Sequence, residues 1–191
     1  MAYNERLENP RYELVDGREM LLARPALNHD IVQSNLSGII WQYLKGKRCK
    51  LFGEVDVYFD KDNHYIPDLL IVCDLDKIKP AHIEGAPDLI VEILSPRTSK
   101  NDLGIKKDTY EKYGVKEYWI VNPQDKSITV YHLKDGRYKL DNVYTIMPDY
   151  ELEDMSEKEK AEHSLALKVS LYDDLEINVA EVFEGMLPWQ Q

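Results

Sequence analysis

The sequence is poor in cysteine and has no long hydrophobic run. Among its 191 residues only Cys49 and Cys73 are cysteine, and both fall in segments that we expect to be separate strands. The simplest expectation is two buried, reduced thiols in a cytoplasmic protein, with no zinc site. Apolar runs such as 69–73 have the length of strands and are too short to cross a bilayer, and residues 1–10 lack a signal-peptide core. We therefore expect no membrane-embedded segment.

Positive charge is also scarce. Lysine and arginine number 24 against 35 aspartates and glutamates, so the formal net charge is −11. Residues 149–184 hold twelve acidic residues and three lysines, which leaves a net charge of only −2 on the rest of the chain. The segment 97–116 has six basic and three acidic residues. A second basic cluster consists of Lys45, Lys47, Arg48 and Lys50. The acidic total is therefore compatible with a nucleic-acid partner at the basic parts of the chain.

The chain has the size of one domain, and it contains neither an internal repeat nor a linker-like stretch. We expect a single domain over 1–191, with 149–170 as a charged surface segment, either loop or short helix. Asp16-Gly17 between alternating residues predicts a hairpin at 11–22. Helices are expected from Asn28, as N-cap, to about Lys45 and over 99–113, and a short one near the C-terminus. Strands are expected at 50–59, 66–73, 86–94, 117–121, 127–133, 138–146 and early in 170–183. This order predicts an α/β fold, with a mixed central sheet flanked by helices and an N-terminal β-hairpin.

Two carboxylates stand where the pattern favours other residue types. Asp68 follows Pro67 at the start of a hydrophobic strand, and Glu92 interrupts the apolar run 89–94. A nearly continuous apolar run indicates a strand that is buried on both faces. A carboxylate inside such a strand is unfavourable unless it is paired or binds a metal ion. Glu92 is therefore the most informative residue of the sequence.

Lys106 is the third unexpected residue. At 100° per residue, Leu103, Tyr110 and Tyr113 define the inward face of the helix 99–113, and Lys106 falls near the middle of that face. Lys107 falls well outside it and is expected in solvent. We predict that Lys106 points toward the sheet.

Two acidic residues and an inward lysine match the requirements of phosphodiester hydrolysis. Asp68 and Glu92 would bind a hard divalent cation, Mg²⁺ or Mn²⁺, which prefers oxygen ligands. Such an ion lowers the pKa of a bound water and stabilises the charge of the transition state. Lys106 would orient or help to deprotonate that water and would neutralise the phosphate.

These residues resemble the Uma-type putative restriction endonuclease family, which belongs to the PD-(D/E)XK nuclease superfamily. The resemblance covers most of the chain up to about Val130. It rests on Tyr12-Glu13-Leu14 with Gly17, His29, Pro67-Asp68, the run 91–96, and Asp102, Lys106, Tyr110 and 114–119. It implies a restriction-endonuclease-like core and metal-dependent cleavage of nucleic acid, with DNA as the expected substrate. The usual superfamily lysine, two residues after the acid, is replaced here by Leu94. The resemblance implies a lysine that has moved to the next helix, in agreement with Lys106.

Several residues are candidates for accessory roles. His29 is expected to be a polar residue at a helix start or on the substrate side. Glu13 and Asp56 are candidates for a third acid, although each is simpler to explain as structural. Asp102 is expected to pair with Lys106 four residues later or to cap the helix, and the Tyr110 hydroxyl is a candidate to reach the site.

Alternative interpretations remain open from the sequence. Asp68 can cap a turn, and Glu92 with Lys106 can form a buried salt bridge of structural origin. The chain can then be a nuclease fold that has lost turnover but still binds nucleic acid or a protein. A glycosidase with paired carboxylates is a weaker alternative, because it needs no inward lysine. We also expect a homodimer, since two strands of DNA have to be addressed.

Overall fold

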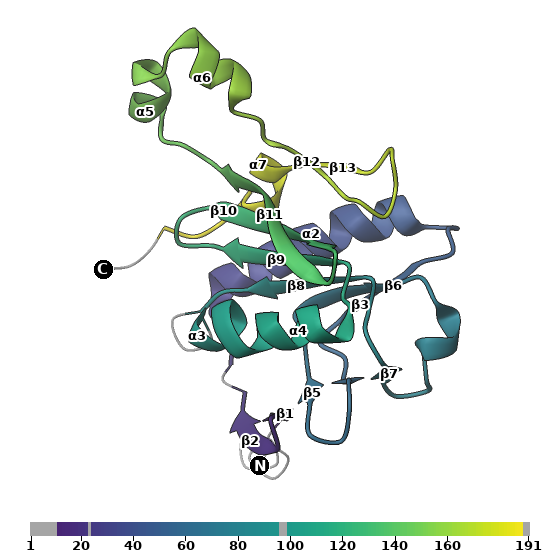
Figure 1. The fold of residues 1–191 in the computed structure, drawn as a ribbon. Coiled ribbons are helices and arrows are strands. Elements are labelled where there is room, and N and C mark those ends of the chain that lie inside the picture. Colours follow the sequence, from purple (N-terminus) through teal and green to yellow (C-terminus); the bar gives the residue numbers. More distant parts are fainter. Residues whose placement is uncertain (1–10, 23, 96–98, 189–191) are drawn as a thin grey trace.

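A computed structural model describes residues 11–22, 24–95 and 99–188 of the chain. Residues 1–10, Pro96 and Arg97, which were used in the sequence analysis, lie outside these ranges. The centre of the molecule is a six-stranded mixed sheet with helices on both faces, as predicted (Figure 1). Within the described residues, no helix combines the length and apolarity that a membrane crossing requires.

The six-stranded sheet has the order β11-β10-β9-β8-β6-β3. Strands β8 and β9 are parallel, and every other neighbouring pair in this sheet is antiparallel. The bounds are β3 Lys50–Gly53, β6 Leu69–Val72, β8 Leu89–Ile93, β9 Glu117–Asn122, β10 Ser127–Lys134 and β11 Arg137–Thr145. All five residues of β8 are buried, so the prediction of a strand covered on both faces is confirmed.

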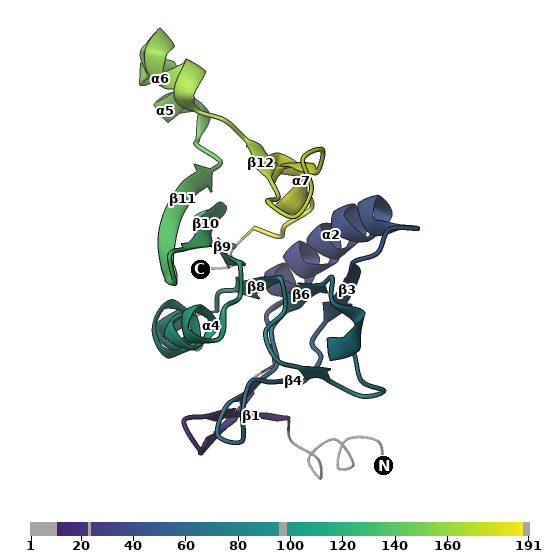
Figure 2. The same ribbon diagram turned by 45° about the vertical axis from the view of Figure 1, so that its right-hand side comes forward.

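The two faces of this sheet contribute to two separate hydrophobic cores. Helix α2, Leu27–Leu44, packs with Val32, Leu36 and Ile40 on the face that carries Leu69 and Val91. The opposite face carries the alternate residues of the same strands and packs against Tyr110 and a smaller sheet (Figure 2). Since side chains alternate along a strand, Glu92 belongs to this second face.

The smaller sheet has the order β2-β1-β5-β4-β7. Its strands are β1 Tyr12–Val15, β2 Arg18–Leu21, β4 Val57–Tyr58, β5 His64–Tyr65 and β7 Ile83–Glu84. The hairpin β1–β2 is confirmed, and both turn residues have positive φ, 48° at Asp16 and 75° at Gly17. Glu13 and Val15 are its buried residues, whereas Tyr12 is exposed. This register points a glutamate into the protein.

The predictions for the strand 50–59, for the start of α2 and for the two cysteines are wrong. The single strand expected over 50–59 is divided into β3 and β4, which lie in different sheets, and Glu54 between them has a φ of 50°. Asn28 does not cap α2; its side chain binds the backbone of Leu187 instead. Cys49 and Cys73 are not free thiols but form a disulfide, because the pairing of β3 with β6 brings them opposite one another.

The helix expected over 99–113 is present but is not a uniform α-helix. It consists of α3 Ser99–Asn101, the π-helical segment η2 Asp102–Lys106 and α4 Lys107–Tyr113. It ends at Gly114 with a φ of 86°, as the glycine predicts. One turn of a π-helix contains more residues than one turn of an α-helix, so a π-helical segment changes which residues face inward. Leu103 is therefore 53% exposed, contrary to prediction, whereas Asp102 and Lys106 are both buried.

The remaining elements surround this core. The short helices α5 and α6 form an arm that extends away from the sheets (Figure 1). The two strands β12 and β13 pair with each other, and α7 packs near α2. Their bounds are η1 Leu75–Lys77, α5 Asp149–Asp154, α6 Glu157–Glu162, β12 Ala166–Lys168, β13 Glu176–Asn178 and α7 Val179–Val182.

Candidate active site

Asp68 and Glu92 come from neighbouring antiparallel strands. The pairing of β6 with β8 joins Ile71 to Leu89, Leu70 to Ile90 and Leu69 to Val91. One more step in this register places Asp68 opposite Glu92. Side chains of opposite residues lie on the same face of a sheet, with Cβ atoms about 4.5–5.5 Å apart. The sheet therefore brings the two carboxylates together.

Glu92 is enclosed by polar partners inside the second core. Its side chain is 4% exposed, and its Oε1 atom lies 3.1 Å from Lys106 Nζ. The Tyr110 hydroxyl donates a hydrogen bond of 2.6 Å to the same oxygen. Burial raises the pKa of Glu92 well above its ordinary value, and the neighbouring carboxylates add to this rise while Lys106 opposes it. Burial therefore favours the protonated form of Glu92, and a further cation nearby would favour the carboxylate.

Lys106 is surrounded by three carboxylates. Its Nζ atom lies 2.8 Å from Glu13, 3.1 Å from Glu92 and 3.4 Å from Asp102. Burial alone would lower the pKa of Lys106, but Glu92, Glu13 and Asp102 together raise it well above the ordinary value. The side chain is therefore an ammonium ion at neutral pH. It can neutralise negative charge, and it is poorly suited to accept a proton.

Asp68 is more accessible than its neighbours and is held at both oxygens. Its side chain is 17% exposed, and its Oδ1 atom lies 3.1 Å from His29 Nε2. The backbone N–H of Ile93 donates a hydrogen bond of 2.6 Å to Oδ2. Gln33, one turn after His29, donates 2.8 Å to the backbone carbonyl of Asp68. Burial lowers the pKa of the His29 imidazole, but the neighbouring carboxylates, Asp68 first among them, raise it above its ordinary value.

The candidates from the sequence divide into those that meet here and those that do not. The residues that meet are Asp68, Glu92, Lys106, Glu13, Asp102, Tyr110 and His29. Asp56 is elsewhere, bound to His64 at 2.6 Å. Lys107 is not fully in solvent, because its Nζ atom lies 3.9 Å from the ring of Tyr131. The basic cluster around Lys45 is also remote, since about 24 Å of helix separates it from His29.

Two contributors to the site were missed in the sequence. Gln33 was not identified, although its spacing of four from His29 on one helix face was a usable signal. The second is the backbone N–H of Ile93, which carries no sequence signal. The inward direction of Glu13 was also open, because both alternating faces of 12–15 contain an apolar residue.

The donor set fits a hard divalent cation. Of the groups that contact the acidic side chains Glu13, Asp68, Glu92 and Asp102, Lys106 carries a full positive charge, and His29 contributes an imidazole. No cluster of three or more His, Cys, Asp or Glu is arranged to hold a metal ion in the described part of the chain. Mg²⁺ often uses only one or two carboxylates and keeps several waters. Asp68 and Glu92 are sufficient for that kind of binding.

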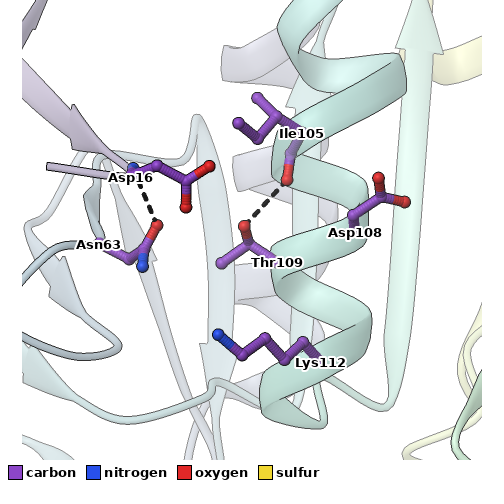
Figure 3. Close-up of a pocket in the computed structure, with 6 residues that line it drawn as sticks. All are labelled: Asp16, Asn63, Ile105, Asp108, Thr109 and Lys112. Atoms are coloured by element: carbon purple, nitrogen blue, oxygen red, sulfur yellow. Dashed lines mark hydrogen bonds between the residues drawn. The ribbon is translucent and has the colours of Figure 1, made fainter. Parts of the chain in front are cut away.

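A hollow of about 450 Å³ lies between the helical residues Ile105, Asp108, Thr109 and Lys112 and the turn residues Asp16 and Asn63 (Figure 3). In this hollow Asp16 donates its backbone N–H to Asn63, and the Thr109 hydroxyl bonds the carbonyl of Ile105. Thr109 also contacts the Tyr65 hydroxyl at 3.1 Å, and the Tyr65 ring lies 5.8 Å from Lys106 Nζ. Tyr65 therefore lies close both to Thr109, which lines the hollow, and to Lys106.

The chain is similar to known proteins in sequence and in fold. The family model Uma2, with the description "Putative restriction endonuclease", matches residues 2–172. The uncharacterized protein slr1290 of Synechocystis sp. is 27% identical over 135 residues, which cover 69% of this chain and 70% of that protein. A crystal structure described as a putative nuclease from Anabaena variabilis superposes with a TM-score of 0.71 and 22% identity, over 96% of this chain and 98% of that one. At this identity the likeness shows a shared fold, a restriction-endonuclease-like core.

Proposed function

Since this chain belongs to the Uma2 family of putative restriction endonucleases, which indicates a nuclease, we propose that it is a metal-dependent endonuclease. Asp68, Glu92 and Lys106 are its proposed catalytic residues. The finer assignments are also proposals: DNA as substrate, Mg²⁺ or Mn²⁺ as cofactor, a homodimer in the cytoplasm, and one domain over 1–191.

One observation carries this proposal. Two carboxylates from neighbouring strands lie on one face of the central sheet, with an ammonium group 3.1 Å from one of them. A purely structural ion pair needs one acid and one base, whereas here an excess of acidic groups is buried around one lysine. Buried charge of one sign is unfavourable unless it is compensated. A bound cation supplies that compensation.

Asp68 and Glu92 are the residues that would hold the cation. When bound, a divalent ion lowers the pKa of a coordinated water and stabilises the charge of the phosphodiester transition state. Lys106 is an ammonium ion, so its contribution is charge neutralisation and orientation of the scissile phosphate. Tyr110 holds Glu92 through its hydroxyl, and Glu13 and Asp102 hold Lys106.

A cleavage assay with the purified full chain tests the proposal. Single-stranded, double-stranded and branched DNA, and RNA, are incubated with Mg²⁺, with Mn²⁺ or with EDTA. We expect cleavage of at least one DNA substrate with metal and none with EDTA. Asp68→Asn and Glu92→Gln should lower the rate by about a hundredfold or more, in the range expected for removal of a key transition-state contact, whereas Lys107→Ala should not. Intact substrates under every metal condition would contradict the proposal.

A second candidate function is a nuclease fold without turnover that binds nucleic acid or protein. The burial of the cluster favours it, because the side chains of Glu92 and Lys106 are only 4% and 5% exposed. Calorimetric titration with Mn²⁺ separates the two functions. A saturable site that is lost in Asp68→Asn favours the nuclease, and the absence of any saturable site favours the inactive module.

A further inference from the structure

The carboxylate of Asp68 has its orientation set from two directions. Its Oδ1 atom lies 3.1 Å from His29 Nε2, and its Oδ2 atom accepts the backbone N–H of Ile93 at 2.6 Å. We propose that His29 is the positioning residue that orients Asp68 for metal binding. This inference rests on the proposed function, because it assigns the role of Asp68 as a metal ligand.

The imidazole of His29 is well placed to fix a neighbouring group. Its side chain is only 8% exposed and lies in the first turn of α2. This helix is anchored in the core through Val32, Leu36 and Ile40, which are completely buried. The ring therefore has little freedom to move relative to the sheet that carries Asp68.

The same helix also holds the backbone of Asp68. Gln33 follows His29 by four residues, so the two side chains lie on one face of α2. Gln33 binds the carbonyl of Asp68 at 2.8 Å while His29 faces the carboxylate. Two adjacent turns of α2 thus fix both the main chain and the side chain of one residue.

The hydrogen-bond chemistry leaves Asp68 able to bind a metal ion. Each carboxylate oxygen offers two acceptor positions, and His29 and Ile93 occupy one on each oxygen. The second ring nitrogen, Nδ1, has no hydrogen-bond partner among the described residues, and the nearest carboxylate is Asp30 at 3.7 Å. Nε2 is therefore the ring nitrogen that contacts the carboxylate of Asp68. Groups that orient a ligating carboxylate in this way support metal affinity.

Manganese binding to the full chain tests this role without depending on cleavage. Free Mn²⁺ is measured by electron paramagnetic resonance during titration of the unchanged protein and three variants. In His29→Gln the amide nitrogen can replace Nε2, whereas the shorter side chain in His29→Asn cannot reach Asp68. Asp30→Asn is the matched control, because it changes the neighbour of Nδ1 and leaves the contact to Asp68. Thermal unfolding in EDTA is recorded for each protein.

We expect His29→Asn to weaken Mn²⁺ binding by about 10- to 100-fold, and His29→Gln and Asp30→Asn to stay within about threefold of the unchanged protein. Equal Mn²⁺ affinity in His29→Asn and the unchanged protein would overturn the positioning role alone. Equal weakening in the Gln and Asn variants would overturn it as well, because the donor atom would then be irrelevant. No Mn²⁺ binding by the unchanged protein would overturn both this role and the proposed function. Tight binding without cleavage of any substrate would reject only the nuclease.

Discussion

At the scale of single residues, the surroundings of Lys106 differ from those of an ordinary buried ion pair. Three carboxylates contact one ammonium group, and a fourth acid, Asp68, enters from the strand next to that of Glu92. Each carboxylate that stays ionised depends on a nearby cation, so the cluster couples protonation, metal binding and stability.

Replacement of Lys106 by methionine should destabilise the fold. The change leaves Glu13, Glu92 and Asp102 without the ammonium group that each contacts. Breaking a buried ion pair on one side costs about 3–5 kcal/mol, and we expect a loss of that size in urea denaturation. Lys107→Met is the control and should change the unfolding free energy by less than about 1 kcal/mol, since its contact is a cation–π interaction with Tyr131. Equal stability of the two variants would contradict the assigned charge cluster.

Replacement of Glu92 by glutamine should change how stability depends on pH. Because burial raises the pKa of Glu92, its side chain stays protonated in the folded protein above about pH 4.5, where the same side chain of the unfolded chain has lost its proton. The stabilising contribution is complete below that pH and is lost as pH rises toward the folded pKa. Glutamine removes this loss, so in EDTA the stability of Glu92→Gln relative to the unchanged protein should increase with pH. The increase is at most about 1.4 kcal/mol per pH unit. A difference that stays constant between about pH 5 and about pH 8 would refute the raised pKa.

The sequence predicted the most unusual residues of the site and missed others for physical reasons. Glu92 and Lys106 were identifiable because each breaks an apolar pattern. The direction of Glu13 was not, since 12–15 has an apolar residue on either face and tertiary packing decides which face is buried. The disulfide of Cys49 with Cys73 depends on the register of β3 against β6, which no local pattern encodes.

At the scale of secondary-structure elements, a π-helical segment and a β-hairpin position several of the site residues. The π-segment η2 turns Asp102 and Lys106 inward together and leaves Leu103 exposed. A uniform 100° periodicity cannot predict this arrangement, so Lys106 was correctly predicted to be buried on an argument that wrongly included Leu103. The hairpin β1–β2 places Glu13 against Lys106. The Asp16-Gly17 turn was sufficient to predict the hairpin.

The turn of this hairpin should tolerate an added methyl group poorly. Gly17 has a φ of 75°, so Gly17→Ala forces an L-residue into a left-handed conformation, at a cost of about 1–2 kcal/mol. Gly38→Ala is the matched control, because Gly38 lies within α2 with nothing within 4 Å of an added Cβ. That change should be neutral or stabilise by up to about 1 kcal/mol. Chemical denaturation measures both, and a loss of stability in Gly38→Ala as large as that in Gly17→Ala would contradict the turn geometry.

At the scale of the whole molecule, the order of elements was enough to predict an α/β core, because the hydrophobic periods of strands and helices differ clearly. Almost half of the net negative charge of the chain lies in one segment outside the candidate site. The segment 149–162 holds seven acidic residues and two lysines, a net charge of −5 out of −11. It forms the projecting arm of α5 and α6 (Figure 1), and the side chains of 149–160 are mostly exposed.

Removal of this arm should strengthen nucleic-acid binding and preserve the site. We expect a variant in which a short Gly-Ser linker replaces 149–162 to bind DNA more tightly at low salt, because a polyanion is repelled less. Its Mn²⁺ affinity should be unchanged, since every proposed catalytic residue lies outside the segment. Fluorescence anisotropy at several salt concentrations measures the effect. Weaker DNA binding after deletion would show that the arm itself contacts the substrate.

The most direct measurement is a crystal structure of the full chain soaked in Mn²⁺, with the ion located by its anomalous scattering. We expect one strong peak between the carboxylates of Asp68 and Glu92, with His29 still in contact with Asp68. The same soak of Asp68→Asn should lack the peak. No peak at this position in the unchanged protein, or a peak only at carboxylates elsewhere, would contradict the metal site on which the proposed chemistry depends.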